Sequence, residues 1–162
     1  MSGKRQPIPS VSVNLALPIM REPPTDAAEV RTPGDCYREL SPLCAPLAQE
    51  AFFVITLNTK YRVIDRHLIS LGILDACLVH PREVFRRAVM DCAAAIVICH
   101  NHPSGDSAPS REDLKLTRQL IEAGRIMDIE ILDHVIIGRP FDRNPQGFTS
   151  LRESGLVSFS TP

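Results

Sequence analysis

Apolar runs separated by polar turns follow one another from about residue 50 onward, and their lengths and spacing distinguish strands from helices. The runs AFFVITL and YRVIDRHLISLG lie on either side of the turn NTK and predict a β-hairpin. AAAIVICH is short and almost wholly apolar, which is typical of a strand buried on both faces. MDIEILDHVIIG predicts another strand, and GFTSLRESGLV can supply a last one after the loop RPFDRNPQ.

Two segments between these strands have helical periodicity. HPREVFRRAVMDC has Pro81 near its start and places one apolar face along its length: Val84, Phe85, Ala88, Val89 and Cys92. SREDLKLTRQLIEAG has Ser110 as a candidate N-cap, acids in its first turn and Gly124 near its end. Strands with intervening helices predict an α/β or α+β fold, with one mixed central sheet flanked by helices.

The first part of the chain has a different composition. Eight of the 14 prolines fall within the first 46 residues, which predicts an N-terminal tail over residues 1–26. VSVNLAL in this tail alternates enough to add an edge strand. Residues 27–40 contain Pro33 and Gly34 and predict at best a short or broken helix. We expect a single domain over residues 27–157 and a short C-terminal tail over 158–162.

Composition and net charge argue against several classes of protein. A formal net charge of −1 lacks the basic excess typical of nucleic-acid-binding domains. The five cysteines are odd in number and form no CxxC pair, which favours reduced thiols and a cytoplasmic location. The chain has no apolar run approaching the ~20 residues of a membrane span. The sequence does not indicate an oligomeric state.

The segment ICHNHPSGDSAPSRED contains the most informative polar residues. His100 and His102 end the predicted buried strand, and residues i and i+2 of an extended chain point to the same side. Asp113 follows in the first turn of the next predicted helix. Two imidazoles and one carboxylate suit a catalytic zinc ion, one per chain, with water as the fourth ligand. Iron and manganese remain alternatives.

Simpler roles compete with this interpretation. Ser110 and Asp113 have the spacing of a helix capping box. Cys99 alternates away from the two histidines and predicts core packing. His134 can orient a metal ligand, although a purely structural histidine is the more ordinary interpretation. His67 and His80 are expected at the surface or at a helix entry. The combined spacing of the two histidines and the aspartate favours a metal site.

The same residues resemble a known motif. H-x-H, seven residues, Ser, two residues and Asp are similar to the JAMM motif of JAB/MPN+ metalloproteases. The flanking segments VHPREVFRRAV, AAAIVICHNHPSG and LDHVIIG resemble the RadC branch, from about Gln49 to Gly138 and less clearly to Val157. This resemblance implies a JAB/MPN-like fold, with an architecture like that of cytidine deaminases. The chain looks like a short, single-domain form without a helix-hairpin-helix module.

The resemblance also implies roles for individual residues. Glu50, directly before AFFVITL, matches the glutamate that acts as general base. Glu83 is the rival, but its place in a helix first turn already has a reason in the helix dipole. Ser110 matches a residue that hydrogen-bonds the oxyanion. The implied activity is zinc-dependent hydrolysis of a peptide or isopeptide bond in an unidentified substrate.

Two other functions are weighed against hydrolysis. A RadC-like, DNA-repair-associated protein would use the metal structurally and cleave nothing, and would bind DNA in a salt-sensitive way. A nucleobase deaminase would need an H-x-E and a P-C-x-x-C sequence. The chain contains neither sequence, so a deaminase is discounted.

Overall fold

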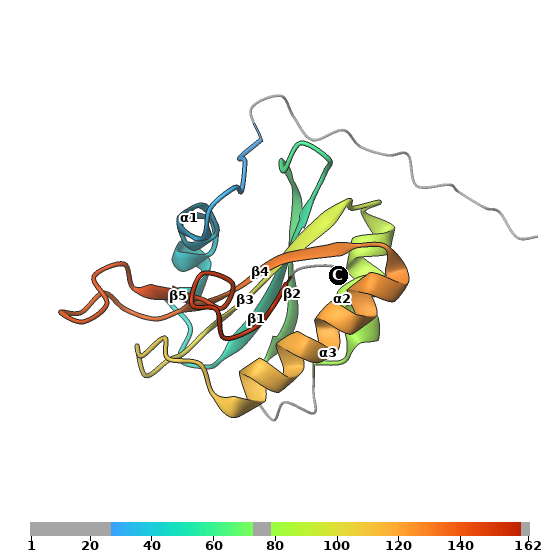
Figure 1. Cartoon of the computed structure of the whole chain (residues 1–162). Coiled ribbons are helices and arrows are strands. Elements are labelled where there is room, and N and C mark those ends of the chain that lie inside the picture. The colour runs from blue at the N-terminus through green and yellow to red at the C-terminus, as the bar shows by residue number, and fades with distance from the viewer. Residues whose placement is uncertain (1–26, 73–78, 160–162) are drawn as a thin grey trace, which may run out of the picture.

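The computed structural model describes residues 27–72 and 79–159 and contains one mixed sheet with helices on both faces (Figure 1). In chain order, the elements are α1 Pro33–Cys44, β1 Ala51–Leu57, β2 Val63–Leu71, α2 Pro81–Met90, β3 Ala95–Asn101, α3 Arg111–Met127, β4 Glu130–Ile137 and β5 Phe148–Ser150. The strand order is β2-β1-β3-β4-β5. β3 and β4 are parallel, and the other neighbouring pairs are antiparallel. This is the predicted α+β class with a mixed sheet.

The strands follow the apolar pattern of the sequence. β1 and β3 are buried at every position because they occupy the middle of the sheet. β2 lies at the sheet edge, is partly exposed, and pairs with β1 as the predicted hairpin. β5 is shorter than the segment that suggested it and covers only Phe148–Ser150.

Two apolar clusters lie on opposite faces of the sheet. Helices α2 and α3 cover one face of the sheet (Figure 1). Phe52, Ile98 and Leu120 belong to the buried cluster on this face. Helix α1 packs on the other face, where Cys36 and Leu40 belong to the same buried cluster as Cys99. The prediction that Cys99 packs in the core is therefore confirmed. Successive residues of β3 alternate between these two environments.

Helix α1 corrects the expectation of a short or broken helix. It is continuous over 12 residues, with Pro33 at the first helical positions. Proline is tolerated there because the first N–H groups of a helix have no intrahelical acceptor. Thr32 and Asp35 form a capping box that satisfies the helix start. Pro33 therefore begins this helix, and Pro42 lies within it without ending it.

The predicted helix ends also need correction. α2 ends at Met90, so the predicted apolar face stops early: Val89 is 51% exposed and Cys92 is exposed. α3 continues past Gly124 to Met127. Gly124 serves close packing instead, since a Cβ there would lie 2.7 Å from the carbonyl oxygen of Ile129. The local periodicity of the sequence marked neither the end of α2 at Met90 nor the end of α3 at Met127.

Some predictions fall outside the described residues. The N-terminal tail over 1–26, with its edge strand, is among them. At the other end of the chain, Phe159 is 6% exposed and belongs to the cluster under α2 and α3. Within the described ranges, no helix has the length and apolar character required to cross a membrane.

Candidate metal centre

Four side chains from three parts of the chain converge at one end of the sheet. Glu50, His100, His102 and Asp113 each offer a ligand atom, and these atoms lie within 4.8 Å of one another. The two Nε2 atoms of His100 and His102 are 3.0 Å apart. Asp113 Oδ1 lies 3.3 Å from His100 Nε2, and Asp113 Oδ2 lies 3.7 Å from His102 Nε2. Glu50 Oε1 is 3.6 Å from both imidazole nitrogens.

The strand directions explain this convergence. β1 and β3 are antiparallel, so the start of β1 lies beside the end of β3, with Phe52 paired to His100. Glu50 directly precedes β1, and His102 directly follows β3. The nine residues 102–110 connect β3 to α3, whose first turn carries Asp113. Sheet topology thus brings together residues that are about 50 positions apart in sequence.

The cluster is closed on its inner side and open on its outer side. The side chains of His100 and Asp113 are 1% and 8% exposed. Those of His102 and Glu50 are 17% and 21% exposed, so solvent reaches the cluster from their side. A buried ligand side with one accessible side is the arrangement expected of a catalytic metal site with a vacant position for water.

Hydrogen bonds on the far side of each imidazole orient the rings. His102 Nδ1 lies 2.7 Å from the carbonyl oxygen of Asp106. A carbonyl only accepts, so His102 carries a proton on Nδ1, and Nε2 faces the cluster. His100 Nδ1 lies 2.8 Å from Nε2 of His134, a fully buried histidine on β4. The sequence left His134 with two possible roles, structural or ligand-orienting, and its contact with His100 is one that the ligand-orienting role requires.

The charges of the cluster shift the pKa values of its members. Burial favours a higher pKa for Asp113, but the adjacent imidazoles of His100 and His102 outweigh it and hold the pKa well below the ordinary value. The adjacent carboxylate of Asp113 raises the pKa of His102. Burial lowers the pKa of His100 and raises that of Glu50, and the negative charge of Asp113 raises the latter further. A cation among these groups would relieve the repulsion between the two carboxylates.

Ser110 has the capping role that the sequence suggested for it. It is the N-cap of α3, and its hydroxyl oxygen accepts a hydrogen bond from the backbone N–H of Asp113 at 3.1 Å. The hydroxyl also donates to Asp113 Oδ2 at 2.7 Å. The capping box is therefore present, and it holds the carboxylate of Asp113 at the edge of the cluster.

Glu83 lies elsewhere, on α2. Its carboxylate is 3.3 Å from Arg86 and 3.4 Å from Arg82, at the helix surface. Among the described residues, the metal-ligand cluster contains Glu50 and not Glu83.

A second group of potential ligands, Asp65, His67 and Asp91, lies near the end of α2. Asp91 Oδ2 accepts a hydrogen bond from the Thr56 hydroxyl at 2.6 Å and lies 2.6 Å from His67 Nε2. Asp65 is the more distant member, 3.9 Å from His67 Nε2. These side chains satisfy one another, which accounts for their proximity.

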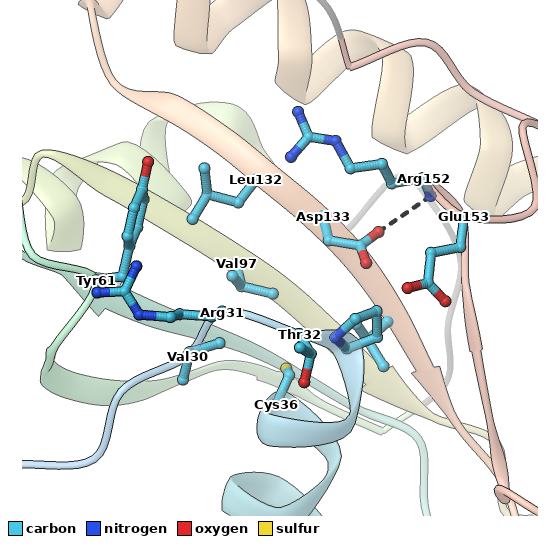
Figure 2. A pocket seen from close by; sticks show the side chains of 12 residues that line it. Val30, Arg31, Thr32, Cys36, Tyr61, Val97, Leu132, Asp133, Arg152 and Glu153 are labelled. Carbon is cyan, nitrogen blue, oxygen red and sulfur yellow. Dashed lines mark hydrogen bonds between the residues drawn. The ribbon is translucent and has the colours of Figure 1, made fainter.

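Two cavities differ in whether a residue of the cluster lines them. One of about 370 Å³ is lined by Asn101 and His102, by Tyr37 and Cys44 of α1, and by Arg139 after β4. The other, of about 330 Å³, lies between the start of α1 and β4 (Figure 2). The lining of the second cavity, within the described chain, includes none of the four clustered residues. Of the four clustered residues, His102 lines the first cavity.

Comparison with known proteins shows the family of this chain. The family model described as RadC-like JAB domain matches residues 30–156. A UPF0758 protein of Symbiobacterium thermophilum is 46% identical over 135 residues, which are 83% of this chain and 55% of the relative. A UPF0758 protein of Bacillus cereus is 49% identical over 128 residues, 79% of this chain and 54% of the relative. The chain thus spans about half the length of these relatives, and it belongs to the RadC-like JAB domain family.

Proposed function

We propose that this protein is a zinc-dependent hydrolase of peptide or isopeptide bonds. The observation that supports the proposal is the convergence of two imidazole Nε2 atoms and two carboxylates within 4.8 Å of one another. The carbonyl of Asp106 accepts the Nδ1 proton of His102, so its Nε2 atom faces the cluster and can offer a lone pair to a cation. Imidazole nitrogens and carboxylate oxygens gathered this closely are donors that bind a divalent cation.

The donor set fits zinc. His100, His102 and Asp113 would hold the ion, because two nitrogen ligands and one carboxylate are a common catalytic set for this metal. When bound there, zinc would lower the pKa of a water ligand and polarise a substrate carbonyl. The site would be completed by solvent on the open side, between His102 and Glu50.

Glu50 has the position and the basicity for proton transfer. Its carboxylate lies 3.6 Å from each imidazole nitrogen and is partly open to solvent. Burial raises the pKa of Glu50, which brings it closer to the operating range of a general base. In the proposed reaction, Glu50 takes a proton from the attacking water and later delivers it to the leaving amine.

Ser110 is proposed as the oxyanion donor. Its hydroxyl lies at the rim of the cluster and donates to Asp113. Redirecting this one proton towards the substrate oxygen would stabilise the negative charge that develops there. The substrate chain would occupy the cavity beside His102, between α1 and Arg139.

A structural metal without hydrolysis is the second candidate. Glu50 lies as close to both histidines as a fourth ligand would, and four protein ligands would close the site. Glu50→Gln separates the two candidates. If Glu50 is a base, the variant keeps its zinc and loses hydrolysis. If Glu50 is a ligand, zinc affinity falls together with any activity.

The experiment starts with elemental analysis of the purified full chain after zinc-replete expression. We expect one zinc per chain in the wild type, and a loss in His102→Ala and Asp113→Ala. His67→Ala removes a histidine from the other histidine–carboxylate group and should keep the ion. Peptide and isopeptide substrates are then screened with wild type and Glu50→Gln. A wild-type protein without stoichiometric metal would overturn the proposal.

The cellular location is part of the proposal. Cys36, Cys44, Cys92 and Cys99 are free thiols in the described chain. Free thiols persist in a reducing compartment, so we propose a cytoplasmic location.

A further inference from the structure

We propose that His134 and Thr117 are positioning residues that fix the tautomer of His100, so that its Nε2 atom is left unprotonated towards the metal. This inference rests on the proposed metal site and concerns how that site is prepared. His134 and Thr117 are both fully buried, and neither belongs to the cluster of candidate ligands.

Three short contacts connect the start of α3 with His100. The Thr117 hydroxyl lies 2.6 Å from the carbonyl oxygen of Asp113, one helical turn earlier. The same hydroxyl lies 2.6 Å from His134 Nδ1. His134 Nε2 then lies 2.8 Å from His100 Nδ1. We call these contacts, from the Asp113 carbonyl to His100, the buried relay.

The number of available protons gives the buried relay a direction. The Asp113 carbonyl can only accept, so the single hydroxyl proton of Thr117 lies between these two oxygens. The Thr117 oxygen therefore accepts from His134, which must carry its proton on Nδ1. A neutral His134 then has a bare Nε2, which accepts from His100. His100 is left with its proton on Nδ1 and a lone pair on Nε2.

The opposite direction carries an energetic penalty. If Thr117 donated to His134, two oxygens would face each other at 2.6 Å without a proton between them. That arrangement would leave a buried carbonyl and hydroxyl in repulsive contact. It would also place the proton of His100 on Nε2, where it would block a metal ion. The direction in which Thr117 donates to the Asp113 carbonyl is therefore the one that leaves His100 Nε2 without a proton.

Packing holds both rings in the orientation that the buried relay needs. The ring of Phe52 stacks on His100, with an interplanar angle of 8° and centroids 6.2 Å apart, and presents an edge-on contact to His134. The parallel pairing of β3 and β4 places His134 opposite Ile98, which lies two residues before His100 on the same strand. On the other face of β4, Asp133 lines the cavity of Figure 2 and accepts a hydrogen bond from the backbone N–H of His134.

Asp113 belongs both to the proposed metal site and to the buried relay. Its carboxylate is a proposed metal ligand, while its carbonyl oxygen begins the buried relay. The first turn of α3 thus sets the position of one ligand and, through Thr117 and His134, the protonation of another. Partners of metal-bound histidines of this kind typically contribute 10–100-fold to metal affinity.

The first test uses the metal-free wild-type chain and needs no substrate. Long-range proton–nitrogen NMR at a pH above the titration of the histidines identifies which ring nitrogen carries each proton. We expect His100 and His134 both to be protonated on Nδ1. A wild-type protein with the proton of His100 on Nε2 would overturn the inference, whether or not zinc binds.

The second test measures zinc affinity by competition with a chelator of known affinity. We expect roughly 10–100-fold weaker binding in Thr117→Val and His134→Leu. His134→Gln keeps an acceptor for His100 and should recover part of the loss. Thr56→Val is the control, because Thr56 is equally buried but donates its hydroxyl to Asp91.

The outcomes separate this inference from the proposed function. Thr117→Val preserves shape, so it tests the inference even if His134→Leu does not fold. Unchanged affinity in folded Thr117→Val, or equal losses in Thr117→Val and Thr56→Val, would contradict the buried relay. A wild type that binds no zinc would refute the metal site, while the NMR result would still decide the tautomer.

Discussion

The side chain of Asn101 is hydrogen-bonded to the backbone N–H of Ala51, with Oδ1 2.8 Å from the nitrogen. Its Nδ2 donates to the carbonyl of Gln49 at 3.2 Å. Asn101 therefore holds the chain on both sides of Glu50, although it lies between the two histidines in sequence. One residue of β3 thus fixes the position of the proposed base relative to the proposed ligands.

Removing this amide should loosen Glu50 without removing a metal ligand. We expect Asn101→Ala to lower the free energy of unfolding by about 1–3 kcal/mol, because the buried backbone N–H of Ala51 loses its acceptor. Zinc content should stay at the wild-type level and hydrolysis should fall. Chemical denaturation and elemental analysis measure the first two effects. Gln146→Ala, at an exposed amide, is the control and should change neither.

Zinc should stabilise the folded protein. A ligand that binds only the native state at 100 times its dissociation constant adds about 2.7 kcal/mol to the free energy of unfolding. We expect thermal denaturation to show a higher Tm for the wild type with zinc than with a chelator. His102→Ala should show no such difference. A zinc-induced shift of equal size in this variant would place the ion elsewhere.

Ser110→Ala separates helix capping from catalysis. Loss of an N-cap typically costs about 1 kcal/mol of stability. Loss of an oxyanion donor typically costs ~10²–10³ in kcat. Thr32→Ala is the matched control, because Thr32 caps α1 through the same kind of capping box. We expect similar stability losses in the two variants and a loss of hydrolysis in Ser110→Ala alone. Equal rates in the two variants would limit Ser110 to capping.

The raised pKa of Glu50 predicts a pH-dependent cost in the metal-free protein. Because burial raises the pKa above its unfolded value, the carboxylate is less stable in the folded state than in the unfolded chain. The cost is present above the folded pKa and disappears as the pH falls below the unfolded value. We therefore expect Glu50→Gln to raise the Tm of metal-free protein at neutral pH, with a gain that shrinks under acid conditions. A gain that grows on acidification would contradict the shift.

Gly138 supports the loop that follows His102. A Cβ at position 138 would lie 2.4 Å from the carbonyl oxygen of Gly105, whose own φ of +88° suits glycine. We expect Gly138→Ala to displace this loop, lower the Tm and weaken zinc binding. Gly34→Ala is the control, because the nearest atoms to a Cβ there are at ordinary contact distances of 3.7 Å or more. Wild-type affinity in folded Gly138→Ala would show that the loop can shift without disturbing His102.

The sequence by itself determined the features that depend on local periodicity and spacing. AFFVITL and AAAIVICH indicated the central strands, and Ser110 indicated the start of α3. His100 and His102 face one side because alternate residues of a strand do so. Asp113 lies near them because a helix begins a few residues after that strand. These relationships extend over little more than a dozen residues and follow from backbone geometry alone.

The tertiary structure decided which distant side chains meet. Pro33 and Gly34 suggested a broken helix, but packing on the sheet and the cap at Thr32 keep α1 continuous. The pairing of β3 with β4 brings His134 to His100, and the antiparallel β1 brings Glu50 to both histidines. A buried polar group must find a partner, but strand order and register select it. That choice depends on contacts across the whole sheet, which no local pattern contains.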